Sequence, residues 1–322
     1  MSMPIYILKR ILQAIPLLII VSIMSFIIIK LSPIDPLAEL KLNPAISPQV
    51  LQSEKQRLGL DLPVYRQYFN WAGNFVKGDL GVSTSGEKVS DRLMERLPNT
   101  LLLTISVIIV TWLVAIPLGI YSALNWKSSF DRFLTVISSM GMAVPTFFFA
   151  LLLLIFAVKT GWFPVGGLTS VGFENFNPVH KFFDVVHHLI LPVTVLATAS
   201  LAGLQRQMRG NLLDVLESDY VKMARAKGLP ENKVIYKHAV RNAINPMVTL
   251  FGFEFASLLS GAALTEFVLQ YPGLGRLMLE AVMKSDMNLV MASLIIGTLM
   301  LIAGNLIADI LLKFVDPRVS LD

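Results

Sequence analysis

The chain has 322 residues, of which 54% are hydrophobic and only 15% are charged, and its formal net charge is +5. A soluble domain usually carries about 25% charged residues, so this chain has too little polar surface for a soluble globule, and its apolar content excludes a disordered chain. The charge deficit also argues against a nucleic-acid binder despite the basic pI of about 9.3, and a membrane protein is the expected class. The absence of cysteine excludes disulfides and thiolate metal sites.

Six charge-poor runs of the sequence are long enough to cross a bilayer, since a spanning helix needs roughly 20 consecutive apolar residues. In chain order the runs cover residues 10–30, 96–127, 132–159, 184–206, 242–265 and 286–309. Within these bounds, Glu254 is the one charge that interrupts a run. The sequence therefore predicts an all-α, polytopic membrane protein with six transmembrane helices. Four prolines inside the runs each remove a backbone hydrogen bond and predict kinks: Pro16, Pro117, Pro145 and Pro192.

The first run follows Lys9 and Arg10, as the apolar part of a secretory signal would. No small-residue cleavage site follows the run, so we expect a retained helix.

The distribution of basic residues predicts the orientation of the helices. Lysine and arginine favour the cytoplasmic side of a bilayer. They concentrate in segment 206–241, around residues 127–132 and near both ends of the chain. Both termini are therefore expected in the cytoplasm.

This topology divides the chain into four parts. They are an N-terminal segment with the first helix (1–31), an outer helical loop (32–97), a five-helix core (98–312) that contains the inner loop 206–245, and a cytoplasmic tail (313–322).

The outer loop is predicted to form short helices and no separate domain. Ser47-Pro48 is a helix-start pair, and Asp61-Leu62-Pro63 precedes an amphipathic run that closes at Gly78. The apolar face of this run is expected to rest on the membrane surface or on the outer mouth of the bundle; a cap that simply packs on the bundle is the plainer alternative. The run 81–88 is spaced like a phosphate-binding loop, but its lysine comes one residue late and Val89 replaces the required hydroxyl, so no nucleotide site is predicted.

The inner loop is dense in residues that begin and end helices. Asp219 is expected to cap a two-turn helix that runs to Lys227, and Gly228 to supply the left-handed position after it. Pro230 starts a second helix and Pro246 the fifth span. The second helix carries its apolar residues on one side: Val234, Ile235, Ala239 and Val240. Because two turns are unstable alone, the first helix must pack on something, through Tyr220, Met223, Ala224 and Leu229.

Three acidic residues near the spans receive separate interpretations. Glu254 lies inside the fifth span, where a charge costs several kcal/mol unless it is paired, protonated or facing water; it is either a polar tie between helices or a pathway-lining residue. Glu266, near the outer end of that span, is expected to be solvated. Asp309 stands four residues before Lys313, a spacing that predicts an ion pair at a helix end.

The sequence shows no set of groups that suggests catalysis. His187 and His188 are adjacent, so they point to different faces of a helix, and no third ligand is near; no metal site is predicted. No Ser/His/Asp set or paired metal-binding carboxylates are recognisable. We expect a protein that is not an enzyme and needs no cofactor. An ion-coupled secondary transporter stays open as an alternative, with Glu254 as its one hint.

Two stretches of the inner loop carry a resemblance to a known family: DYVKMARAKGL (219–229) and HAVRNAINP (238–246). Further matching motifs occur along the chain: LGLD (58–61), GDLG (78–81), VPTF (144–147), GWFPVGG (161–167), YPGLG (271–275) and DPR (316–318). Together they resemble the permease subunits of ABC importers of type I, and more narrowly the dipeptide/oligopeptide/nickel branch of that superfamily.

In such permeases, the resemblance implies, the short helix of the inner loop is a coupling helix seated in a groove of a cytoplasmic ATPase. The family motif is written Glu-Ala-Ala, three residues, then Gly. Aligned on Gly228, this chain keeps Ala224 as the second alanine but has Lys222 and Met223 at the first two positions. The residues expected to couple to the ATPase are Asp219, Tyr220, Met223, Ala224, Lys227, Gly228 and Leu229.

The resemblance also implies partners and a cargo. The partners are a second homologous permease subunit, two cytoplasmic ATP-binding subunits and an external substrate-binding protein, assembled in the bilayer of a bacterial or archaeal plasma (inner) membrane. ATP binding would move the coupling helices and switch the spans between inward-facing and outward-facing states. Di- and oligopeptides are the expected cargo; nickel chelates, glutathione or another small solute are the alternatives for the same machinery.

Overall fold

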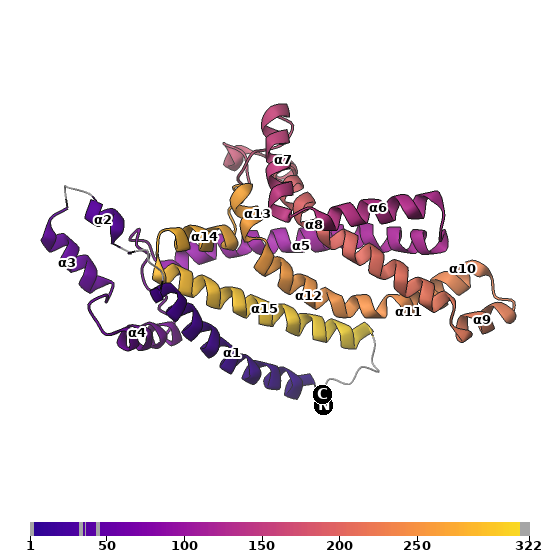
Figure 1. The fold of residues 1–322 in the computed structure, drawn as a ribbon, viewed down its shortest axis with the longest axis horizontal. Helices are drawn as coiled ribbons and strands as arrows, with labels where there is room; N and C mark the ends of the chain where they lie inside the picture. Colours follow the sequence, from indigo (N-terminus) through magenta and orange to yellow (C-terminus); the bar gives the residue numbers. More distant parts are fainter. Residues whose placement is uncertain (1–2, 32–34, 36, 43–45, 316–322) are drawn as a thin grey trace.

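The computed structural model describes residues 3–31, 35, 37–42 and 46–315, which form helices, turns and one isolated bridge between Val82 and Lys88. Among these described residues, four helices are each long and apolar enough to cross a membrane: α1 (Met3–Leu31), α5 (Val89–Leu124), α8 (Pro178–Leu216) and α15 (Met287–Val315). In Figure 1, α1, α5, α12 (Asn245–Gly261) and α15 run along one another as a bundle. These helices confirm the predicted all-helical membrane class; the count of six spans stays a prediction.

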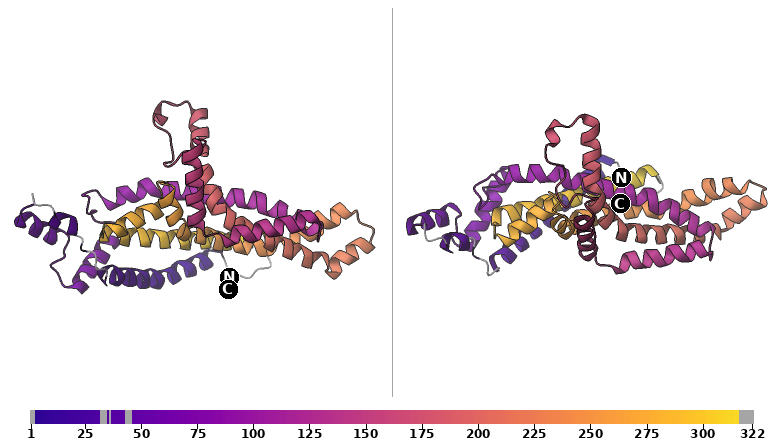
Figure 2. Two further views of the ribbon diagram at one scale, coloured as in Figure 1. Left: turned by 45° about the horizontal axis from the view of Figure 1, so that its top comes forward. Right: turned by 90° about the horizontal axis from the view of Figure 1, so that it is seen from above.

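The third predicted span is not one helix. Residues 132–159 are divided between α6 (Ser129–Ala143) and α7 (Thr146–Thr160), which meet at an angle of 99°. Val144 is extended (φ −84°, ψ 123°), because the ring of Pro145 disfavours a helical backbone in the residue before it. The expected kink at Pro145 is therefore a corner, and α7 projects from the side of the bundle (Figures 1 and 2). The other three prolines lie inside continuous helices: Pro16, Pro117 and Pro192.

The fifth predicted span is also divided. Pro246 stands in the first turn of α12, as expected, and α12 gives way at Ala262 to the short helix α13 (Ala263–Val268). A turn then leads into α14 (Leu274–Met283). Other short helices connect the long ones. They are η1 (Phe173–Asn175) between α7 and α8, and α9 (Asp219–Ala226), α10 (Glu231–Lys233), η2 (Val234–Val240) and α11 (Arg241–Ala243) between α8 and α12.

Glu266 is fully buried, so the prediction that it is solvated was wrong. Its carboxylate accepts hydrogen bonds from the Thr100 hydroxyl of α5 (3.1 Å) and from the backbone N–H of Arg276 in the first turn of α14 (2.9 Å). The N-terminus of α14 favours this negative charge. Gly273 must lack a side chain, because a Cβ there would lie 2.3 Å from the carboxylate. The turn 271–275 thus joins α13, α14 and α5 around one acidic group, a contact between distant segments that local spacing does not indicate.

The outer loop contains three short helices: α2 (Ala38–Leu42), α3 (Pro48–Arg57) and α4 (Val64–Val76). The hydroxyl of Ser47 caps α3, and Gly78 turns the chain after α4 with φ +83°, as predicted for both. Tyr68 of α4 packs on α1: its ring centroid lies 5.4 Å from that of Phe26, and its hydroxyl lies 2.9 Å from that of Ser22. α4 was expected to rest either on the membrane surface or on the bundle, and the structure shows it packed on the bundle.

α5 and α8 form the most extensive helix pair of the bundle. α5 begins at Val89, so the predicted boundary of the outer loop at residue 97 falls inside this helix. Gly119 lets the two helices approach closely, because a Cβ there would lie 2.7 Å from the Cβ of Met208 and 2.9 Å from the carbonyl oxygen of Gln205. Since a backbone atom is one of these neighbours, a side-chain rotation alone would not make room for a larger residue.

A polar contact joins α1 to α15. The hydroxyl of Tyr6 donates to a carboxylate oxygen of Asp309 (2.6 Å), and the guanidinium of Arg10 pairs with the same oxygen (2.8 Å). Asp309 therefore pairs with residues of another helix. The side chain of Lys313, its predicted partner, lies outside the described residues.

Candidate functional site

The short helix α9 stands at one end of the molecule, beyond the last turn of α8 (Figure 1). The prediction that Asp219 caps it was wrong by one residue: Ser218 holds the extended N-cap position (φ −69°, ψ 151°), and Asp219 is the first helical residue. The hydroxyl of Ser218 donates to the carbonyl of Val215 in α8 and makes no capping bond. Asp219 therefore stabilises the start of α9 by its negative charge, which is favourable in the first turn of a helix.

α9 has one buried and one exposed face. Val221 and Ala224 are 0% and 8% exposed, whereas Tyr220 and Met223 are 44% and 57% exposed. Of the residues expected to pack on something, Ala224 and the partly buried Leu229 pack within this chain, and Met223 is left exposed. Tyr220 is also exposed, but its hydroxyl accepts a hydrogen bond from the side-chain amide of Asn242 (3.0 Å). Val221, the most buried residue of the helix, was missed because a single valine in two turns gives no periodic signal.

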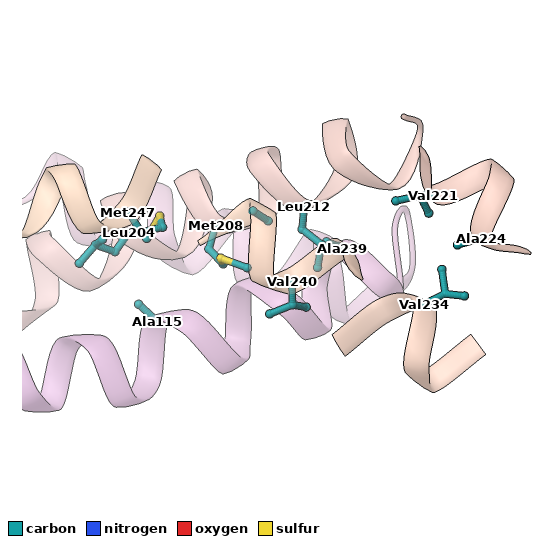
Figure 3. Packing of buried hydrophobic residues seen from close by; sticks show 12 residues of the cluster. Ala115, Leu204, Met208, Leu212, Val221, Ala224, Val234, Ala239, Val240 and Met247 are labelled. Atoms are coloured by element: carbon teal, nitrogen blue, oxygen red, sulfur yellow. The ribbon is translucent and has the colours of Figure 1, made fainter. Parts of the chain in front are cut away.

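The buried face of α9 is fixed to the bundle through the segment that follows it. Val221 and Ala224 lie near Val234 of η2, and the same cluster continues through Ala239 and Val240 to Leu212 of α8 (Figure 3). It ends among residues of three long helices: Ala115 of α5, Met208 of α8 and Met247 of α12. Contiguous apolar packing therefore connects α9 to these three helices.

The predicted second helix is present, with an unexpected winding. After Pro230 the chain forms α10, the π-helix η2 and α11. Val234, Ala239 and Val240 are buried, and Ile235 is packed against them, as predicted. Two pairs of these residues are spaced by five (234 and 239, 235 and 240), the interval of π-helix hydrogen bonds, so the wider turn keeps them on one side.

Gly228 provides the turn between the two helices. Its φ is +75°, the left-handed conformation predicted for it, and Lys227 occupies the C-cap before it. No atom outside its neighbours lies within 4 Å of a Cβ built on Gly228, so the backbone alone requires glycine. An exposed ion pair between Arg225 and Glu231 (2.7 Å) spans the turn.

An ion pair that the sequence did not reveal fixes α6 to the part of α8 that leads to α9. The guanidinium of Arg209 donates to both carboxylate oxygens of Asp131, at 2.7 and 2.9 Å. Asp131 is 3% exposed and also accepts from the backbone N–H of Lys127 (3.0 Å) and the hydroxyl of Ser122. The Arg209 guanidinium holds the pKa of Asp131 well below its usual range.

Glu254 lies within the bundle, partly buried on α12. One carboxylate oxygen accepts a hydrogen bond from the indole N–H of Trp112 on α5 (2.7 Å). The other is buried with no hydrogen-bond partner among the described residues. Within the same residues, no group of three or more His, Asp or Glu side chains is placed to hold a metal ion.

The bundle of long apolar helices fits a membrane permease, and the matching family models identify the chain as one. The chain belongs to the family described as binding-protein-dependent transport system inner membrane components, whose sequence model matches residues 115–321. A second model, for the N-terminal part of such membrane components, matches residues 3–104. The protein is thus a permease of the type I importer fold and not itself an enzyme; the ATPase of such importers is on separate subunits.

Several curated proteins are similar to this chain along almost their whole length. The oligopeptide transport system permease protein AppB of Bacillus subtilis is 43% identical, over 98% of this chain and 99% of its own. The di/tripeptide transport system permease protein DppB of Pseudomonas aeruginosa is 34% identical, over 98% of both chains. The glutathione transport system permease protein GsiC of Escherichia coli is 36% identical, also over 98% of both.

Proposed function

We propose that this chain forms half of the translocation pathway of an ATP-driven importer of di- and oligopeptides. The names of the similar proteins support this cargo, since two of the three are permeases for oligopeptides or for di- and tripeptides. Its partners are a homologous second permease, two cytoplasmic ATP-binding subunits and an external substrate-binding protein. The chain lies in the inner membrane with both termini in the cytoplasm.

The observation that carries the coupling part of this proposal is the two-faced helix α9. Val221 and Ala224 fasten it to the bundle, and Tyr220 and Met223 are left exposed on a helix too short to be stable alone. Such a helix fits a groove on the ATPase: the exposed pair contacts the partner, and the buried pair passes its movement to α5, α8 and α12.

Cysteine cross-linking tests this placement cleanly, because the chain contains no cysteine of its own. Met223→Cys is expected to cross-link to a single cysteine placed in the groove of the ATP-binding subunit, and the yield should change when ATP is added, since the helix moves with the ATPase. Phe69→Cys is the matched control and should give no product with the ATPase, because Phe69 is at least as exposed as Met223 but lies on α4 of the outer loop. Cross-linking from position 69 and none from position 223 would refute both the coupling role and the orientation.

Glutathione is a second candidate cargo, because one group of similar proteins carries that name. Cells lacking this gene should lose uptake of a labelled dipeptide and a labelled tetrapeptide and regain both on complementation, with glutathione and nickel uptake unchanged. Restored glutathione uptake without peptide uptake would assign the alternative cargo. An ion-driven activity of the purified chain alone would contradict the importer.

A further inference from the structure

A cavity of about 490 Å³ lies among α3, α4 and the start of α15. Figure 1 shows these elements at the end of the molecule opposite α9. Four stretches wall the cavity: the end of α3 with the turn that follows (56–62), one face of α4, residues 79–84, and residues 285–288 at the start of α15. The volume lies in the range of about 300 to 1,000 Å³ that is typical of sites for small ligands. The chain therefore has a recess of ligand size that the coupling function does not use.

The wall formed by α4 is rich in side-chain amides. Gln67, Asn70, Trp71 and Asn74 line the cavity, and their spacing of three, four and seven places them on one face of the helix. The ring of Trp71 is held in place by Phe75, 5.4 Å away between centroids. Its indole N–H is buried and has no acceptor among the described residues. Because a buried donor without an acceptor is costly, this N–H is suited to an acceptor supplied by a ligand.

The three charged side chains of the lining all have partners within the chain, which argues against an anion or a metal ion as that ligand. One carboxylate oxygen of Asp79 accepts from a backbone N–H (2.9 Å). Asp286 is buried, and its carboxylate already accepts from the backbone N–H groups of Thr84 (2.9 Å) and Leu289 (3.1 Å). Arg57 is paired with Glu54 at 2.7 Å. Among the described lining residues the groups best placed to recognise a ligand are thus neutral amides, which offer the same donors and acceptors as peptide groups.

We propose that this cavity binds a free peptide of two or three residues by its backbone, through the amide side chains of α4 and the indole N–H of Trp71. The inference rests on the proposed function, because peptides are the cargo proposed for the importer. It adds a peptide site on the outer side of the permease, formed by the outer loop and the start of α15.

Equilibrium dialysis of labelled trialanine against the assembled transporter, purified without its binding protein, tests the site. Trp71→Phe keeps an aromatic ring and removes the donor, so it should weaken binding about five- to tenfold, the effect of one lost hydrogen bond. Asn74→Leu should do the same. Trp162→Phe changes a tryptophan that is 68% exposed on the loop after α7 and should leave binding unchanged. Trialanine with blocked termini should still bind, since the backbone is what is recognised.

Two outcomes would overturn the proposal. The first is absence of saturable trialanine binding to the wild-type transporter, and the second is unchanged binding by Trp71→Phe. If that variant binds peptide normally but no longer docks the external binding protein, the cavity is assigned to a protein segment instead. Peptide uptake by the wild-type transporter with its binding protein is measured in parallel, so that failure of the importer assignment is distinguished from failure of the cavity site.

Discussion

Arg209→Leu is expected to destabilise the protein by about 3 kcal/mol, because it leaves the buried carboxylate of Asp131 without its partner. Removing one member of a buried ion pair is far more costly than removing one of an exposed pair, which contributes about 0 to 1 kcal/mol. The measurement is the apparent melting temperature of the detergent-solubilised transporter, together with the amount of this chain in the membrane. Both are expected to fall clearly.

Two controls separate the charge from the loss of a long side chain. Arg225→Leu removes the arginine of the exposed pair with Glu231 and should change the melting temperature little. The double variant Asp131→Asn, Arg209→Leu removes both charges of the buried pair and should be more stable than Arg209→Leu alone. A double variant as unstable as the single one would show that the pairing is not what stabilises this region.

The same ion pair predicts a dependence on pH with a definite sign. Because the folded protein holds the pKa of Asp131 below its unfolded value of about 3.9, the pair contributes stability above that pH and loses it as the pH falls further. The melting temperature of the double variant should therefore fall less than that of the wild type when the pH is lowered below about 4.

The parts of the site that the sequence predicted are those determined by neighbouring residues. The turn at Gly228 and the start of α12 at Pro246 were predicted because each depends on the backbone preferences of one or two residues. The N-cap of α9 was misplaced by one position because Ser218 and Asp219 are both residues favoured there. Local chemistry thus places an element well and its boundary less well.

The features that the sequence did not predict depend on contacts between distant segments. Glu266 was expected to be solvated because its neighbours along the chain do not reveal that Thr100 and the start of α14 surround it. Asp131 and Arg209 are separated by 78 residues, and the local hydrogen bonds of Asp131 to Lys127 and Ser122 do not indicate this arginine. The corner at Pro145 was expected only as a kink of unstated angle, since proline alone does not determine the bend angle.

Gly228→Val is expected to reduce peptide uptake about tenfold while the chain still reaches the membrane. The left-handed conformation at φ +75° costs a residue with a Cβ roughly 1 to 2 kcal/mol, and more for a β-branched one. No atom stands within 4 Å of the new Cβ, so the strain is relieved by a change of the turn and not by unfolding of the bundle. The turn directs α9 relative to η2, and a change there moves the exposed face of α9 out of position for the ATPase. Uptake and ATP hydrolysis stimulated by the binding protein are measured together.

Gly228→Asn is the matched control, because asparagine tolerates the left-handed conformation much better than valine and adds a side chain of similar size. It should retain most of the uptake, whereas the valine variant should hydrolyse ATP with little transport. Equal loss of uptake by both variants would show that the ATPase fills the space beside position 228 in the assembled importer. Glycine would then be required because any side chain there collides with the ATPase. If neither loses uptake, the turn does not determine the position of α9, and the coupling role proposed for this helix fails.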